Sequence, residues 1–324
     1  MPVIVDSQHP HPFLPSLQSG TAIDIWRAEH QDIRPMEIAI LNLMADKRAT
    51  EQQLAEWLGH TILQVKLTFI APDRYIDKIE QGHEPGHTPR EHIEKFYQRW
   101  SRVRHQKFDG LIITGVNARE RDITQESVWP EVVEILEWSK RHVLSTLFLC
   151  WGALAALHHF HAIGHRKAER KVYGLYDHKL GPDKTGLLRG FPDLFQVPVS
   201  RWRHIDLQAL AQNTLLEAVA TSTETGANII VESDNYDQGR GCFARRIYVL
   251  NHPEYAADTL RLEYERDHAQ DPATPPPAHY FQDGNTEKTP PNSWRHTAQL
   301  YANWVHMIYE ATPFDIADIP NTFG

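Results

Sequence analysis

Six short apolar runs, separated by segments with helical periodicity, constrain the fold of this chain more than any other feature. The runs are typical of buried strands and span 37–43, 65–70, 110–114, 145–149, 228–231 and 246–250. Apolar residues recur at the i, i+3, i+4 and i+7 spacing of a helix over 50–58, 92–104, 129–141, 151–161 and 254–268. Alternating strands and helices predict an α/β fold with a mostly parallel sheet and helices on both faces.

The regions before and after this alternation differ from it in composition. Residues 1–33 are rich in Pro, His and Gln and predict an irregular N-terminal arm. We expect an α/β catalytic domain over 34–270. Residues 271–324 begin as a Pro-rich excursion and turn helical over 293–309, and we expect this C-terminal helix to pack on the same domain.

Charge and cysteine content narrow the class of ligand. The 324 residues carry a net charge of −9, which argues against binding nucleic acid or an anionic membrane. The sequence has no run of about 18 apolar residues and no basic stretch leading into an apolar one at its start. We therefore expect a cytoplasmic protein with small-molecule ligands. Its two cysteines give neither a disulfide framework nor zinc spacing, so we expect no metal.

The segment 145–157 is an apolar strand that runs directly into an Ala-rich helix, with Cys150 at the junction. This pattern is typical of a nucleophile elbow. A thiol at a helix N-terminus lies beside the positive end of the helix dipole, which favours the thiolate, and small residues such as Gly152 let the turn close. The alternative is that Cys150 is a small buried residue at a strand end.

A partner for this thiol follows the strand expected at 246–250. His252 can act as a base, and Glu254 is close enough in the chain to orient the imidazole. Functional groups in such sheets collect at the carboxyl ends of strands, so the placements of Cys150 and His252 agree. The short motif alone is weak, because an isolated histidine is more often structural. Cys242 lies in a Gly-rich segment typical of a hairpin turn, where we expect no function.

Many ordered motifs then point to one family. They are 33–35 with 40–44, Lys47, 50–51, 108–115, 129–130, 137–140, 145–151, 252–255, 293–295 and 312–315. Over 33–315 the chain resembles the homoserine O-acyltransferases, also called homoserine O-succinyltransferases, of methionine biosynthesis. The resemblance implies a class I glutamine amidotransferase-like fold and a homodimer. It also implies an acyl-CoA co-substrate, no permanently bound cofactor, and transfer of the acyl group through the cysteine to the hydroxyl of homoserine.

Site residues follow from the resemblance by position. Cys150 is the expected acyl-thioester nucleophile, His252 the proton acceptor and Glu254 its partner, while the backbone N–H groups of Val116 and Trp151 are expected to bind the oxyanion. The residues expected to contact substrate are Lys47, Lys171, Ser200, Arg201 and Arg266. Arg266 suits the carboxylate of the acceptor, because a guanidinium binds a carboxylate through two hydrogen bonds.

The chain departs from the family around the expected pocket. The loop after Gly115 lacks the usual Ala-Pro, and Arg119 stands where the family selects between acyl donors. A guanidinium there suits an anionic acyl tail, so we favour succinyl over acetyl. Further departures are Ala45, Val199 and Asn251.

The sequence also fits other hypotheses about function. A glutaminase or amidase could use the same fold and triad, and a non-catalytic binding protein could retain both. His158, His161 and His165 share a helical spacing, but Gly164 is expected to break the helix before a metal site forms. The basic cluster 166–171 is either a solvated face or an anchor for the phosphates of CoA.

Overall fold

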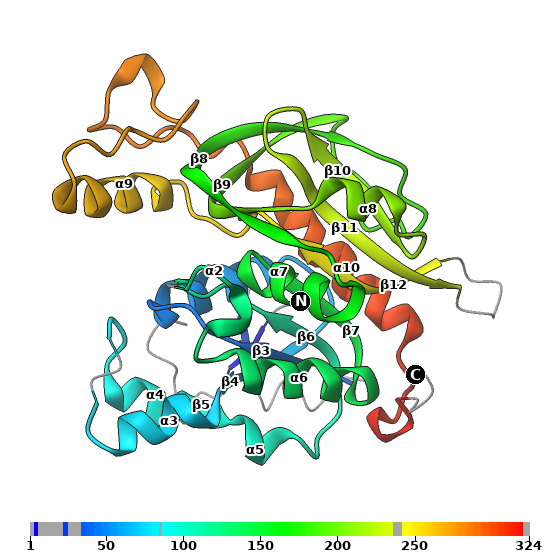
Figure 1. Cartoon of the computed structure of the whole chain (residues 1–324). Coiled ribbons are helices and arrows are strands. Elements are labelled where there is room, and N and C mark those ends of the chain that lie inside the picture. The colour runs from blue at the N-terminus through cyan, green and yellow to red at the C-terminus, as the bar shows by residue number, and fades with distance from the viewer. Residues whose placement is uncertain are drawn as a thin grey trace.

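A twelve-stranded sheet forms the centre of the computed structural model (Figure 1). The structure describes residues 3–5, 22–24, 34–83, 86–118, 120–235 and 242–319. Along the sheet the strands follow the order β2-β1-β4-β3-β6-β7-β12-β11-β10-β8-β9, and β5 pairs with β4 outside this path. Most of the expected N-terminal arm lies outside the described residues.

One part of the sheet, here called the parallel half, has only parallel pairings. Its strands are β1 (Val3–Val5), β2 (Ala22–Asp24), β3 (Met36–Leu41), β4 (Val65–Ala71), β5 (Tyr97–Arg99), β6 (Phe108–Ile113), β7 (Val143–Leu149) and β12 (Cys242–Val249). Leu149 at the end of β7 pairs with Val249 at the end of β12. The segments that follow these two strands therefore start at the same edge of the sheet.

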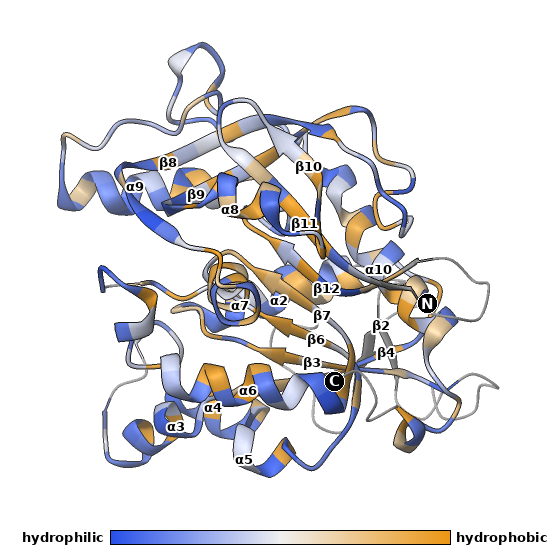
Figure 2. Ribbon diagram, turned by 45° about the vertical axis from the view of Figure 1, so that its right-hand side comes forward, coloured by the Kyte–Doolittle hydropathy of each residue, from blue (hydrophilic) through white to orange (hydrophobic). Residues whose placement is uncertain are grey.

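The remaining strands, here called the antiparallel half, extend the sheet beyond β12. They are β8 (His165–Leu180), β9 (Leu194–Ile205), β10 (Leu216–Ser222) and β11 (Gly226–Asn235). The apolar run 228–231 predicts part of β11, whereas the sequence of the other three strands carries no such run. Figure 2 shows the reason: β3, β6 and β7 are hydrophobic along their length, whereas β8 is largely hydrophilic. The ladder of β8 with β9 is also interrupted between Lys167 and Val172, which breaks the period-two pattern.

Helices cover both faces of the parallel half, so the predicted α/β fold is confirmed. On β3, Ile38 and Ile40 join a core with α2 and α10, while Ala39 and Leu41 join the opposite core with α6 and α7. The helices are α2 (Lys47–Leu58), α3 (Asp73–Glu80), α4 (Arg90–Phe96), α5 (Trp100–Val103), α6 (Trp129–His142), α7 (Trp151–His161), α8 (Leu207–Gln212), α9 (Thr259–Gln270) and α10 (Ala298–Ala311). None of those in the described part of the chain has the length and apolarity needed to span a bilayer.

Two helices predicted from periodicity are wrong in extent. The one expected over 92–104 is interrupted, because Tyr97–Arg99 pairs with β4 as strand β5. The one expected over 254–268 begins only at Thr259. Side chains from distant elements hold the backbone before Thr259 in another conformation, and these contacts form part of the site described next.

Candidate active site

Cys150 lies at a sharp turn between β7 and α7, as the elbow pattern predicts. Its backbone has φ 49° and ψ −112°, a conformation that non-glycine residues rarely adopt. The Cys150 N–H donates to the carbonyl of Val249, 2.7 Å away on β12. A side chain on Gly152 would lie 2.6 Å from the carbonyl oxygen of Ile113, so glycine is required for α7 to start this close to β6. The turn therefore fixes the cysteine at the edge of the sheet.

The loop after β6 packs against this turn. A Cβ on Gly115 would lie 3.3 Å from the Cβ of Cys150 and 3.6 Å from the backbone nitrogen of Trp151. Trp151 is the first residue of α7, so its N–H has no acceptor within the helix. Val116, the other expected oxyanion donor, follows Gly115 directly and is half-buried.

His252 and Glu254 form a buried hydrogen-bonded pair after β12. The Nδ1 of His252 lies 2.7 Å from Oε1 of Glu254, and both side chains are buried. Burial disfavours the charged imidazolium, but attraction first to Cys150 and then to Glu254 raises the pKa of His252 well above its usual value. Side-chain hydrogen bonds to both residues add to this effect. The structure thus brings together all three residues predicted for the triad.

Side chains from α2 and from the segment 294–297 donate hydrogen bonds to the backbone of the segment that carries this pair. The carbonyl of Pro253 accepts from the Thr297 hydroxyl at 3.0 Å. The carbonyl of Glu254 accepts from the indole of Trp57 at 2.8 Å. The carbonyl of the next residue, Tyr255, accepts from the indole of Trp294 at 2.7 Å. Because these carbonyls are already bonded, they do not enter a helical ladder, which explains why α9 starts later than predicted.

Tyr255 links the pair to a polar network on the antiparallel half. Its ring stacks on the imidazole of His252 with centroids 4.2 Å apart, and its hydroxyl donates to Glu263 at 2.7 Å. Glu263 also accepts from the Ser200 hydroxyl at 2.6 Å and from Lys171 at 2.9 Å. Burial would raise the pKa of Glu263, but Lys171, Ser200 and Tyr255 together hold it below its usual value.

Three of the predicted substrate residues thus belong to one region. Lys171 and Ser200 meet at Glu263, and Arg266 lies one helical turn further along α9. The side chain of Arg266 is 56% exposed and contacts Asp267 at 2.7 Å. Tyr255 and Glu263 were not predicted as members of this network. Tyr255 belongs to the motif 252–255, but α9 has little amphipathic pattern that would single out Glu263.

Arg201 belongs to β9, the edge strand that pairs with β8, and its side chain is buried. It is 5% exposed and donates to the carbonyl oxygen of Thr225, while its Nε has no hydrogen-bond partner in the described part of the chain. Burial lowers the pKa of Arg201 to about 10, and attraction to Cys150 opposes that change. Its guanidinium therefore lies within electrostatic reach of the sulfur.

Lys47 is buried beneath the loop that follows β3. Its ammonium donates to the carbonyls of Asn42 at 2.7 Å and Met44 at 3.1 Å, and it lies 4.6 Å from the ring centre of Tyr75. Burial lowers the pKa of Lys47 to about 8, and Glu51 opposes the effect. The sulfur of Met44 would lie 3.6 Å from a Cβ on Gly115, so Lys47 supports the loop beside the elbow.

Two of the predicted residues, Arg119 and Cys242, lie in or beside segments outside the described residues. Arg119 lies outside the described residues, so its expected part in acyl selection stays a prediction. Arg203 binds the loop directly after it, donating to the carbonyls of Glu120 and Arg121. Cys242 is the first residue of β12, next to the undescribed residues 236–241.

The histidines of the last turn of α7 and of the start of β8 make different contacts. His161 bonds to Glu232 and Tyr248, while His158 and His165 stack edge to face with ring centres 5.8 Å apart. Helix α7 ends at His161, before His165. Among the described residues, no group of three or more His, Cys, Asp or Glu side chains could hold a metal ion.

Comparison with known proteins decides the family. The family model described as homoserine O-succinyltransferase matches residues 2–314. The chain belongs to the homoserine O-acyltransferase family. It is 38% identical to a homoserine O-acetyltransferase of Bacillus licheniformis, covering 97% of this chain and 99% of that protein. It is 37% identical to a homoserine O-succinyltransferase of Alteromonas mediterranea, covering 98% and 97%.

Membership in the homoserine O-acyltransferase family makes the chain an enzyme of methionine biosynthesis that transfers acetyl or succinyl from an acyl-CoA to homoserine. Relatives of both kinds match almost equally well, so identity does not select the acyl group. Among solved structures, a glutamine amidotransferase of Thermotoga maritima superposes with a TM-score of 0.52 at 12% identity, over 86% of this chain and 99% of that chain. The glutamine amidotransferase-like fold is thereby confirmed.

Proposed function

We propose that Cys150, His252 and Glu254 carry out the acyl transfer as a triad in two half-reactions. The observation that carries this proposal is the strained elbow of Cys150 beside a buried His252–Glu254 pair. Attraction to Cys150 contributes most to raising the pKa of this imidazole, against the effect of burial. In the first half-reaction, the Cys150 thiolate forms a bond to the thioester carbonyl carbon of acyl-CoA. The C–S bond to CoA then breaks, and His252 supplies the proton to the departing thiolate.

Acylation prepares His252 for the second half-reaction. The thioester at Cys150 is neutral, so the attraction that most strongly raises the pKa of His252 is lost, while burial still lowers this pKa and Glu254 still raises it. The imidazole becomes a base and takes the proton of the homoserine hydroxyl, whose oxygen attacks the acyl carbon. Cys150 leaves as a thiolate, and its charge restores the first state. Glu254 orients the imidazole through both steps.

The oxyanion of each tetrahedral intermediate is assigned to two backbone donors at the elbow. Trp151 provides an N–H at the start of α7, where the helix dipole adds positive potential. Val116 follows Gly115, which packs against Cys150. For the acceptor, the exposed guanidinium of Arg266 suits the homoserine carboxylate, near Lys171 and Ser200. Lys47 supports the loop next to the elbow, and Arg201 provides positive charge near the acyl carbon.

We further propose a cytoplasmic homodimer without a resident cofactor, for which the family and the net charge of −9 give support. Sedimentation equilibrium would give the mass of the assembly.

The deciding experiment is intact-mass analysis of the protein after incubation with acetyl-CoA or succinyl-CoA and no homoserine. We expect an adduct on Cys150 whose mass identifies the acyl group, and we expect homoserine to remove it. Failure of both donors to label the protein, or an adduct that homoserine leaves in place, would contradict the two-step mechanism. If Arg119 contacts an anionic tail, the succinyl adduct forms faster.

A further inference from the structure

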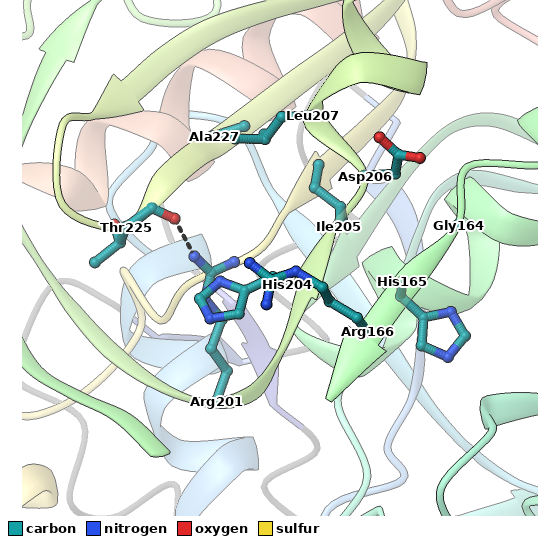
Figure 3. A pocket seen from close by; sticks show the side chains of 10 residues that line it. All are labelled: Gly164, His165, Arg166, Arg201, His204, Ile205, Asp206, Leu207, Thr225 and Ala227. Atoms are coloured by element: carbon teal, nitrogen blue, oxygen red, sulfur yellow. Dashed lines mark hydrogen bonds between the residues drawn. The ribbon is translucent and has the colours of Figure 1, made fainter. Parts of the chain in front are cut away.

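A cavity of about 440 Å³ beside α7 brings together several side chains that can carry positive charge. Arg166 comes from the start of β8, and Arg201 and His204 come from β9 (Figure 3). His165 also lines the cavity. The carboxylate of Asp206 at its rim already accepts the N–H groups of Gln208 and Ala209 as the N-cap of α8.

Arg166 and Arg201, the two guanidinium groups of the cavity, have no carboxylate partner in the described part of the chain. No ion pair joins Arg166 or Arg201 to an acid there, and Nε of the buried Arg201 has no hydrogen-bond acceptor. Burial lowers the pKa of His204, and the charges of Arg201 and Arg166 lower it further, so the three groups face one another. Arg201 is buried while Arg166 is exposed, so an anion that contacts both guanidinium groups would offset the cost of the buried, incompletely bonded charge.

The position of the cavity relative to Cys150 indicates which anion this is. Arg201 lies within electrostatic reach of Cys150, at the N-terminal end of α7. Gly164 and His165 line the cavity just past the other end of the helix, and eleven residues of α7 span about 16 Å. Acyl-CoA has a similar layout, because its extended pantetheine arm separates the thioester from the phosphate groups.

We propose that this cavity binds a phosphate group of the acyl-CoA, with Arg166 and His204 as its contacts and Arg201 between it and the thioester. This inference rests on the proposed function and adds the part of the donor that the triad does not touch. It also assigns different roles to the residues of the basic cluster 166–171. Lys171 is engaged by Glu263 and Asp267, and Lys167 lies 5.8 Å from the ring centre of Trp202, so Arg166 is the member that faces the cavity.

The test compares two donors, one with the phosphates and adenosine of CoA and one that ends at the pantetheine arm. The substitution is Arg166→Ala, and its matched control is Arg170→Ala, an exposed arginine on the same strand that does not line the cavity. KM is measured with acyl-CoA and with the corresponding acyl-pantetheine. We expect Arg166→Ala to raise KM for acyl-CoA about tenfold and to leave KM for acyl-pantetheine unchanged, as loss of a charge-assisted hydrogen bond predicts. Arg166→Lys should restore most of the difference.

Binding of CoA itself, followed by calorimetry, gives a readout that needs no turnover. Arg166→Ala should weaken it by the same factor, and Arg170→Ala should leave it unchanged. Equal effects of the two substitutions, or equal effects of Arg166→Ala on both donors, would overturn the phosphate site. Absence of acyl transfer from either donor in the unaltered protein would instead overturn the proposed function. Failure of that protein to bind CoA would overturn the phosphate site as well.

Discussion

The parallel and antiparallel halves of the sheet hold their functional groups in different ways. At the parallel half, Cys150 is fixed by its own backbone turn and by a hydrogen bond to Val249. At the antiparallel half, the side chains of Ser200 and Lys171 are held through contacts with carboxylates, Glu263 for both and Asp267 also for Lys171. Backbone geometry fixes an atom more tightly than a chain of long side chains. The comparison suggests that the parallel half provides the chemistry and the antiparallel half the binding of substrates.

The strongest test of this division is Cys150→Ala. We expect acyl transfer to fall by more than about 10⁴-fold and the covalent adduct to disappear, because no other nucleophile replaces the sulfur. Thermal unfolding should change little. The control is Cys242→Ala, which should retain both adduct and turnover in a mass and rate assay. An adduct that persisted in Cys150→Ala would assign the nucleophile to another residue.

The second test stays within the parallel half and separates the two half-reactions. His252→Ala should lower kcat by about 10²–10⁴-fold, since the homoserine hydroxyl loses its general base. Rapid-quench measurements should then show acyl-enzyme that homoserine discharges slowly. Glu254→Gln should cost less, because the imidazole remains. A larger loss in Glu254→Gln than in His252→Ala would reverse their assigned roles.

The sequence predicts a feature of either half only where the residues that define it are close together in the chain. The elbow was predictable because β7, Cys150 and Gly152 lie in one short stretch with a local pattern of apolar and small residues. The antiparallel half was not, because β8 carries exposed charges and its ladder with β9 is irregular. Glu263 binds Tyr255 and also Lys171 and Ser200, and no local pattern encodes the last two, which are distant in the chain.

The third test moves to the antiparallel half, where the comparison predicts an effect on KM. Ser200→Ala removes a hydrogen bond to the Glu263 carboxylate. We expect KM for homoserine to rise about tenfold, with kcat within about threefold, because a bond to a charged group is lost outside the reacting atoms. The control is Thr221→Ala, an exposed position on β10. Initial rates over a range of homoserine concentrations decide it, and a loss confined to kcat would contradict the division.

The smallest expected effect concerns two lysines that differ between the halves. Lys171 meets two carboxylates, whereas Lys47 is buried against backbone carbonyls and an aromatic ring. Burial lowers the pKa of Lys47 from 10.5 to about 8, so between these values the unfolded chain binds more protons than the folded one. Stability therefore rises with pH in this window, and below about pH 8 the folded protein bears the full cost of the buried charge.

Lys47→Met should remove this dependence. Urea denaturation at pH 8 and pH 9 should show a gain in the free energy of unfolding on the order of 1 kcal/mol in the unaltered protein, and a smaller gain in the variant. The difference between the two proteins isolates Lys47, because the other titrating groups are common to both. The same slope in both would mean that Lys47 keeps an ordinary pKa in the fold. Lys47 would then support the loop after β3 with no change in its pKa.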